Sequence, residues 1–322
     1  MSGKVVKNPR VVCLGGGHGL AATLAAIRSI TSDITAIVTV ADNGGSSGRL
    51  RKEFPIMPPG DLRMALTALC ADDEWGRSWA EILQYRFTSE GELNGHPVGN
   101  LLLAALWDRD EDAVAGLDRV GALLKVVGRV LPMAAEPVDI EAVFNTNGEE
   151  KIVRGQVQVA TATGSLQSVR LIPQDPDARP ESIEAIEDAE WITMGPGSWF
   201  SSVLPHLLVP EIRGAIAAST AKKILILNLD AHVYQGEDNR EFAGHSPLQH
   251  LLLLERYAPE IKFDYVVADD STSGLDELRS HLSSRGSELL LAQLRSERES
   301  LHHDREKLGQ LFSHINREIL VG

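Results

Sequence analysis

Val11-Val-Cys-Leu-Gly-Gly-Gly-His-Gly-Leu20 is the most informative stretch of the chain, because an apolar strand breaks into glycine there and restarts as a helix. We expect a buried strand over 11–15 and a helix over 20–30. Glycine lets backbone N–H groups approach a ligand closely, and the helix directs its positive end to the same point. The stretch therefore predicts an anion-binding turn over Gly15–Gly19.

Two more glycine-rich turns follow apolar runs. Ala41-Asp-Asn-Gly-Gly-Ser-Ser-Gly-Arg49 comes after the run over 34–40, and Gly195-Pro-Gly-Ser198 comes after the run over 191–194. In a doubly wound sheet, the loops that leave the carboxyl ends of parallel strands converge on one crevice. We therefore expect the three turns to form one site for a nucleotide or another phosphorylated ligand.

Alternating strands and helices predict a three-layer α/β/α, Rossmann-like fold with a mostly parallel sheet. Short strands over 138–144, 151–160 and 168–172, with Asn147-Gly148 as a hairpin turn, predict a small antiparallel insertion within about 136–175. From Gly286 onward the apolar spacing predicts a helix, within a helical C-terminal segment of about 276–322. We expect one domain over 1–322 with these two additions.

Composition narrows the function classes. The chain has 322 residues and a net charge of −14, which argues against a general nucleic-acid or anionic-membrane surface. We expect neither a membrane span nor a signal peptide, because no apolar stretch has membrane-spanning length and Met1-Ser-Gly-Lys4 lacks the long apolar region of a signal peptide. Two cysteines, Cys13 and Cys70, cannot form a disulfide framework and are expected to be reduced. We therefore expect a cytoplasmic protein without membrane insertion or a nucleic-acid partner.

Several residues of the turns have alternative interpretations. Asp42 either bonds its own backbone in a turn, or holds Mg²⁺ beside a diphosphate, or meets a substrate hydroxyl. Ser198 bonds a phosphate or caps the next helix, and Asp61 is expected to cap a helix over 62–71. A nicotinamide site is disfavoured because Leu20 stands where G-x-G-x-x-G requires its third glycine. The sequence contains no H-E-x-x-H, so zinc is also disfavoured.

Longer motifs carry a family resemblance over nearly all of the chain. These are Leu14-Gly-Gly-Gly-His-Gly-Leu20, Val38-Thr-Val-Ala-Asp-Asn-Gly-Gly-Ser-Ser-Gly-Arg-Leu50, Pro58-Pro-Gly-Asp-Leu-Arg63, Gly95-His-Pro-Val-Gly-Asn-Leu101, Gly195-Pro-Gly-Ser198 and His303-Asp304. On them the chain resembles the YvcK-like gluconeogenesis factors, within the superfamily of 2-phospho-L-lactate transferases (CofD-like).

The resemblance implies a cytoplasmic bacterial protein that binds a UDP-sugar such as UDP-N-acetylglucosamine. It also implies support of growth on gluconeogenic carbon sources, of cell shape and of envelope synthesis, with no settled catalytic activity. The transferase branch uses a guanosine diphosphate-linked phospholactate and Mg²⁺, and shares the first turn and the acid at Asp42. That branch replaces the Gly-Gly-Ser-Ser-Gly-Arg segment, so this chain resembles the regulatory branch.

We expect the diphosphate to lie on the first two turns, with Arg49 and Arg63 offsetting its charge. Asp42 and Asn43 would meet a hydroxyl or a metal, and Ser198 and Asn228 would complete the far wall. The full set of predicted ligand-binding residues is Gly15, Gly16, Gly17, His18, Gly19, Asp42, Asn43, Gly44, Gly45, Ser46, Ser47, Arg49, Arg63, Asn100, Gly197, Ser198 and Asn228.

Two alternatives to a UDP-sugar-binding regulator stay open. One is a transferase in which Asp42 is the candidate catalytic residue and holds Mg²⁺, the one candidate metal. The other is a scaffold whose C-terminal helix carries the function, with the ligand as a switch. The sequence gives no certain cofactor, leaves self-association open, and does not identify a protein partner in envelope or carbon metabolism.

Overall fold

The central feature of the fold is a seven-stranded parallel sheet with the strand order β10-β9-β8-β7-β1-β2-β3. The structure, a computed structural model, describes residues 8–110, 112–146, 148–229, 246–296 and 302–321. The strands are β1 Val11–Gly15, β2 Ile34–Val38, β3 Arg129–Pro132, β7 Trp191–Met194, β8 Lys222–Ile226, β9 Tyr265–Asp269 and β10 Glu288–Ala292. From β1 the chain builds outward through β2 and β3, then returns to β7 on the other side. The strand order therefore reverses between β1 and β7, which is the place where such sheets bind ligands.

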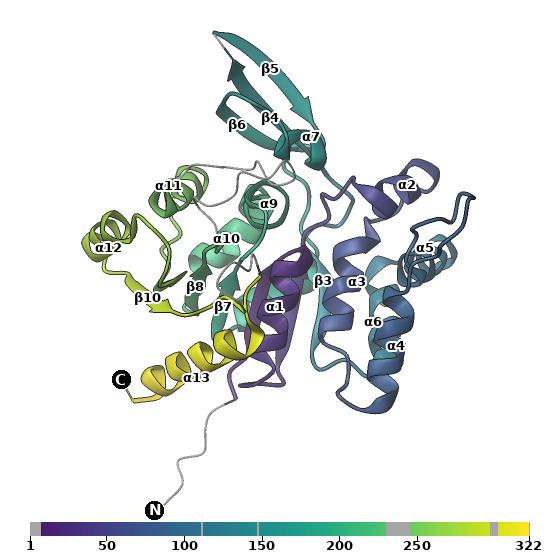
Figure 1. Cartoon of the computed structure of the whole chain (residues 1–322), viewed down its shortest axis with the longest axis horizontal. Helices are drawn as coiled ribbons and strands as arrows, with labels where there is room; N and C mark the ends of the chain where they lie inside the picture. Colours follow the sequence, from purple (N-terminus) through teal and green to yellow (C-terminus); the bar gives the residue numbers. More distant parts are fainter. Residues whose placement is uncertain (1–7, 111, 147, 230–245, 297–301, 322) are drawn as a thin grey trace, which may run out of the picture.

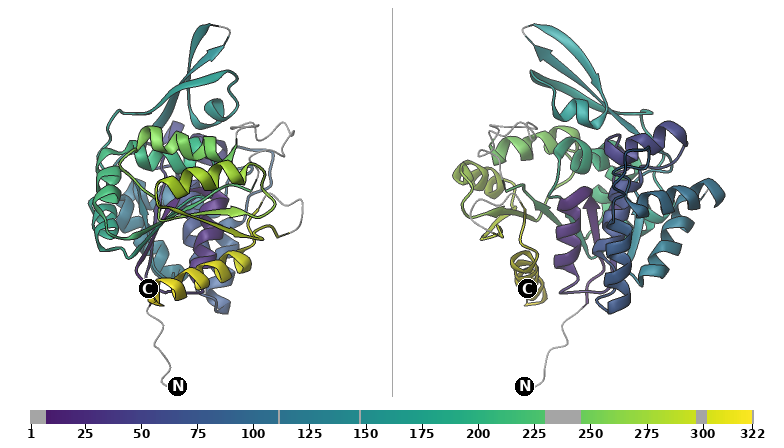
Figure 2. Two further views of the ribbon diagram at one scale, coloured as in Figure 1. Left: turned by 90° about the vertical axis from the view of Figure 1, so that its left-hand side faces the viewer. Right: turned by 45° about the vertical axis from the view of Figure 1, so that its right-hand side comes forward.

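Helices cover both faces of the sheet, with α11 and α12 on one side and α13 on the other (Figures 1 and 2). All five residues of β1 are buried, as expected for a central parallel strand. The helices are α1 Gly17–Ile27, α2 Gly45–Glu53, α3 Pro59–Ala68, α4 Glu74–Gln84, α5 Val98–Asp110, α6 Ala113–Leu124, α7 Gln156–Ala160, α8 Pro180–Asp188, α9 Leu204–Leu208, α10 Pro210–Ala218, α11 Pro247–Tyr257, α12 Leu275–Ser284 and α13 Arg305–Val321, with the π-helix η1 at Trp199–Val203. The predicted α/β class is confirmed.

The predicted antiparallel insertion is a three-stranded sheet that projects from the α/β body (Figure 1). Its strands are β4 Asp139–Thr146, β5 Glu149–Arg154 and β6 Ser165–Ile172, in the order β5-β4-β6. The predicted turn residue Asn147 lies outside the described residues. The strand expected over 151–160 is wrong in its second half, because β5 ends at Arg154 and Gly155, with φ 102°, turns the chain into α7.

The C-terminal segment differs from its prediction. A strand, β10, runs from Glu288 to Ala292 and pairs with β9, where a helix was expected from Gly286. Its continuous apolar run is equally compatible with a short buried strand, and periodicity alone does not separate the two. The helix of this segment, α13, begins at Arg305 and packs on α1, with Leu308, Phe312 and Ile315 buried. None of the described helices is long and apolar enough to cross a membrane.

Candidate functional site

The first and third turns are packed backbone against backbone at the sheet's reversal point. Gly17 begins α1 with φ 57°, in the left-handed region that glycine adopts at little cost. A Cβ added at Gly19 would lie only 2.2 Å from the carbonyl oxygen of Pro196. Glycine at position 19 is therefore required by this close approach, which brings two of the predicted turns together.

Asn228 and Ser198 shape the third turn. The amide N–H of Gly197 donates to Asn228 Oδ1 at 2.9 Å, and Asn228 Nδ2 donates to the Gly197 carbonyl oxygen at 2.9 Å. Ser198 Oγ accepts the backbone N–H of Ser201 at 3.2 Å and the hydroxyl of Ser201 at 2.7 Å. The capping interpretation of Ser198 is confirmed, since it precedes η1. Contact of these two residues with a ligand stays a prediction.

The second turn is the amino end of a helix, because α2 begins at Gly45. The backbone N–H of Gly44 donates to Asp42 Oδ1 at 2.8 Å, so Asp42 does bond its own turn. Ser46 and Ser47 lie buried in the first turn of α2, and Ser47 Oγ accepts the N–H of Gly60 at 3.1 Å. The first amides of α2 therefore face the same edge of the sheet as the first turn.

A buried polar network joins three of the predicted residues. Asn100 Nδ2 donates to Ser46 Oγ at 3.0 Å, and Arg63 Nε donates to Asn100 Oδ1 at 2.9 Å. His96 Nδ1 lies 2.7 Å from Ser46 Oγ on the other side. Arg63 is only 4% exposed, and burial, with a smaller effect of Arg86, lowers its pKa to about 10. The guanidinium therefore keeps its positive charge at neutral pH, close to the start of α2.

Arg49 and Asn43 lie at the rim of the second turn. The exposed Arg49 side chain donates to the carbonyl oxygens of Glu92 at 3.1 Å and Asn94 at 2.8 Å. Asn43 Nδ2 donates to Gln158 Oε1 of α7 at 3.4 Å. Arg49 thus holds the loop that precedes α5, and Asn43 faces the insertion.

Asp61 is a site residue that the sequence reasoning missed. The prediction that it caps a helix over 62–71 is wrong, because α3 begins at Pro59 and Asp61 lies in its first turn. Its carboxylate accepts the backbone N–H of Gly17, and a Cβ added at Gly16 would lie 2.5 Å from Asp61 Oδ2. Burial and the charge of Asp42 raise the pKa of Asp61 to about 7. Proline at the first helical position was the available signal for the earlier helix start.

Asp42 and Asp61 form the acidic part of the site. Burial also raises the pKa of Asp42, and its bonds to Gly44 and Ser47 oppose this shift. Within the described ranges, no cluster of three or more His, Cys, Asp or Glu side chains has the geometry of a metal site. Mg²⁺ typically binds through one or two carboxylates plus substrate phosphates, and this pair fits that donor set. Phosphate oxygens would have to complete the coordination.

His18 is exposed at the mouth of the first turn. Its ring centroid lies 6.1 Å from that of His302, which precedes α13. Burial, then the charges of His302 and Arg63, lower the pKa of His18. The ring therefore lies at the opening of the site and belongs to no packed core.

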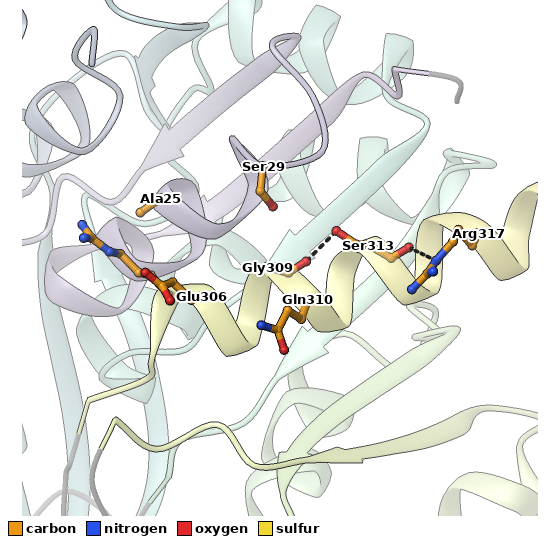
Figure 3. Close-up of a pocket in the computed structure, with 8 residues that line it drawn as sticks. Ala25, Ser29, Glu306, Gly309, Gln310, Ser313 and Arg317 are labelled. Carbon is orange, nitrogen blue, oxygen red and sulfur yellow. Dashed lines mark hydrogen bonds between the residues drawn. The ribbon is translucent and has the colours of Figure 1, made fainter. Parts of the chain in front are cut away.

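A separate groove of about 480 Å³ lies between the end of α1 and α13. Figure 3 shows Ser29, two residues beyond the end of α1, facing Gly309 and Gln310 of α13, with Ser313 and Arg317 farther along the helix. The groove contains none of the predicted ligand-binding residues.

Comparisons with known proteins agree on the family. Residues 11–315 match the family described as 2-phospho-L-lactate transferase CofD. A Mycobacterium tuberculosis (strain H37Rv) protein is 49% identical over 265 residues, which cover 80% of this chain and 75% of that protein. The gluconeogenesis factor of Listeria monocytogenes is 33% identical over 84% of this chain and 86% of its own.

A solved structure supports the fold as well. A UPF0052 family protein from Bacillus halodurans superimposes with a TM-score of 0.83 at 33% identity, over 96% of this chain and 100% of that one. With the sequence matches, this likeness extends over the three turns and the sheet that positions them. The chain belongs to the CofD family and, within it, to the gluconeogenesis factors.

Proposed function

We propose that the chain is a regulatory protein that binds a UDP-sugar of the UDP-N-acetylglucosamine type. The observation that carries the proposal is the meeting of the three glycine turns at the sheet's reversal point. The turns follow β1, β2 and β7, which are parallel neighbours, so their ends share one edge. The contact between Gly19 and Pro196 adds direct packing between two of them.

The diphosphate is proposed to bind at the start of α2. At α1 the N–H of Gly17, the first residue of the helix, already bonds the Asp61 carboxylate, whereas at α2 the Asp42 carboxylate bonds the amide of Gly44, which precedes the helix. At α2, Gly45 has φ 46° and open space around it, and the helix end favours negative charge. Arg63 is positively charged and is linked through Asn100 to Ser46 of α2, so it offsets the ligand's negative charge.

Family membership supports the wider role. As a gluconeogenesis factor, the protein is proposed to act in the cytoplasm, in adaptation to gluconeogenic carbon sources, in cell shape and in envelope synthesis. Its own protein partner in these processes would respond to the ligand-bound state.

Calorimetry of the purified chain with UDP-N-acetylglucosamine, UDP and GDP tests the proposal. We expect heat and a raised melting temperature with UDP-N-acetylglucosamine, and weaker effects with GDP. Replacing Ser47 by Ala removes a hydroxyl at the start of α2 and should lower the affinity for UDP-N-acetylglucosamine and for UDP alike. Absence of both heat and thermal shift at millimolar ligand would exclude the assignment.

The Asp42–Asp61 pair favours a second candidate, a Mg²⁺-dependent transferase that takes a phospho-linked group from a nucleotide diphosphate donor. Two adjacent carboxylates with raised pKa values suit a divalent cation beside a diphosphate. Mg²⁺, if bound there, would stabilise negative charge on the diphosphate. Incubation with donor, Mg²⁺ and a deazaflavin acceptor separates the candidates: nucleoside monophosphate release that Asp61→Asn abolishes supports the enzyme, and binding without release supports the regulator.

A further inference from the structure

The short helix α7 of the insertion covers the second and third turns. Figure 1 shows it between the three-stranded sheet and the α/β body. Gln156 Nε2 donates to Ser201 Oγ at 3.1 Å, and Ser201 in turn bonds Ser198 at 2.7 Å. On the other side, Val157 reaches the second turn: a Cβ added at Gly44 would lie 3.2 Å from Val157 Cγ2. One turn of helix thus spans both turns of the proposed ligand site.

Two side-chain oxygens at this junction have no hydrogen-bond partner among the described residues. They are Gln156 Oε1 and Asn43 Oδ1, and both are shielded from solvent. A buried acceptor without a donor costs about 1–3 kcal/mol, so native proteins retain few of them. Each side chain as a whole is only partly buried, so both amides lie near the surface of the junction and not in the closed core.

We infer that Gln156, together with Asn43, recognises the non-nucleotide end of the ligand by accepting hydrogen bonds from it. The inference rests on the proposed function, and it assigns to the insertion the choice of the sugar. Two neutral amide oxygens suit a group rich in O–H or N–H donors, such as a pyranose with hydroxyl and amide substituents. These two oxygens cannot bond the oxygens of a terminal phosphate, because both groups are acceptors.

Because of the position of α7, different residues contact the two ends of the ligand. The start of α2 and Arg63 are placed to bind the charged diphosphate. Gln156 lies across the site, beside Ser198 and Ser201. A site built to bond a hydroxyl discriminates strongly against ligands that lack it, because its buried groups are then left unpaired. Gln156 therefore governs preference for the sugar conjugate over the bare nucleotide.

The experiment measures one ratio, the Kd for UDP divided by the Kd for UDP-N-acetylglucosamine, by calorimetry on the full chain. Gln156→Leu removes both amide groups and should lower this ratio about five- to tenfold, the effect of about one hydrogen bond. The Kd for UDP should stay within about twofold. Gln156→Glu keeps acceptor oxygens and should retain most of the ratio, although its negative charge should weaken the binding of both ligands. Gln84→Leu, on the exposed end of α4, is the matched control and should change neither Kd.

Melting of the ligand-free variants shows whether they are folded. Gln156→Leu should melt within a few degrees of the wild type, because it loses one bond to Ser201 and also removes an unpaired acceptor. An unchanged ratio in Gln156→Leu, or equal losses for UDP and the sugar conjugate, would overturn the role of Gln156 alone. A wild type that binds neither ligand would overturn the proposed function and this inference with it.

Discussion

Gly19→Ala and Gly214→Ala form a matched pair that tests the packing at the sheet's reversal point. Both glycines lie inside helices, α1 and α10, and neither has a positive φ. Helix propensity alone predicts that each substitution stabilises the protein by up to about 1 kcal/mol. Their surroundings differ, since a Cβ at Gly214 meets nothing within 4 Å, and one at Gly19 meets the Pro196 carbonyl oxygen at 2.2 Å.

At Gly19 the clash determines whether the substitution raises or lowers the free energy of unfolding. The added methyl group is roughly 1 Å too close for an ordinary contact, and its neighbour is backbone, which has no side-chain rotation to relieve it. Overpacking costs about 1–3 kcal/mol or more, which exceeds the propensity gain. We expect Gly19→Ala to lose about 2 kcal/mol of unfolding free energy and Gly214→Ala to gain up to about 1 kcal/mol.

Urea unfolding followed by circular dichroism, with thermal melting in parallel, measures both changes. The clash in Gly19→Ala should move α1 away from the third turn and thereby weaken UDP-sugar binding. Gly214→Ala should bind the UDP-sugar like the wild type. A Gly19→Ala variant as stable as the wild type, with unchanged affinity, would show that the two turns are not packed as described. The proposed crevice would then lose its main geometric support.

Three further changes probe the site. Asn100→Ala should cost about 2 kcal/mol of unfolding free energy in urea melts, because it leaves the buried Arg63 Nε without its acceptor. Arg49→Ala should cost below about 1 kcal/mol in the same melts, since its side chain is exposed, and calorimetry should show a larger loss of UDP-sugar affinity. Burial raises the pKa of Asp61 from 3.8 to about 7, so protonated Asp61 favours the folded state. This contribution to stability is fully present below about pH 4 and is lost as the pH rises to about 7. Melts of Asp61→Asn from pH 4 to 8 should therefore show it gaining stability relative to wild type by up to about 3–4 kcal/mol; a constant difference would exclude the raised pKa.

Local signals account for the parts of the fold that the sequence predicted. The strands β1, β2 and β7 are apolar runs that end in glycine or in a polar turn, and each signal lies within about ten residues. The strands that were missed have weaker local signals. β3 has only four residues and ends in Pro132, and the leucines of β10 fit a helix as well as a strand.

The site residues that were missed depend on tertiary placement. Asp61 looks like a helix cap in sequence, and only the packing of α3 against the first turn brings its carboxylate to Gly17. Gln156 lies in a stretch whose polar and apolar residues alternate as in a strand, and Gly155 overrides that pattern. Similarly, Ser46, Asn100 and Arg63 were each predicted to bind the ligand, but their mutual hydrogen bonds follow from the fold.

The placement of Asp61 changes how the first turn works. A glycine turn before a helix normally offers its amides to an anion, and here a carboxylate of the protein already accepts the amide of Gly17. Asp42 lies close enough to raise the pKa of this carboxylate, so a diphosphate placed beside both would meet further repulsion. At α2 the Asp42 carboxylate accepts the amide of Gly44, which precedes the helix, and Arg63 is linked through Asn100 to Ser46 in the first turn of that helix. The positive charge of Arg63 beside this helix therefore favours the start of α2 over the first turn as the place for the proposed diphosphate.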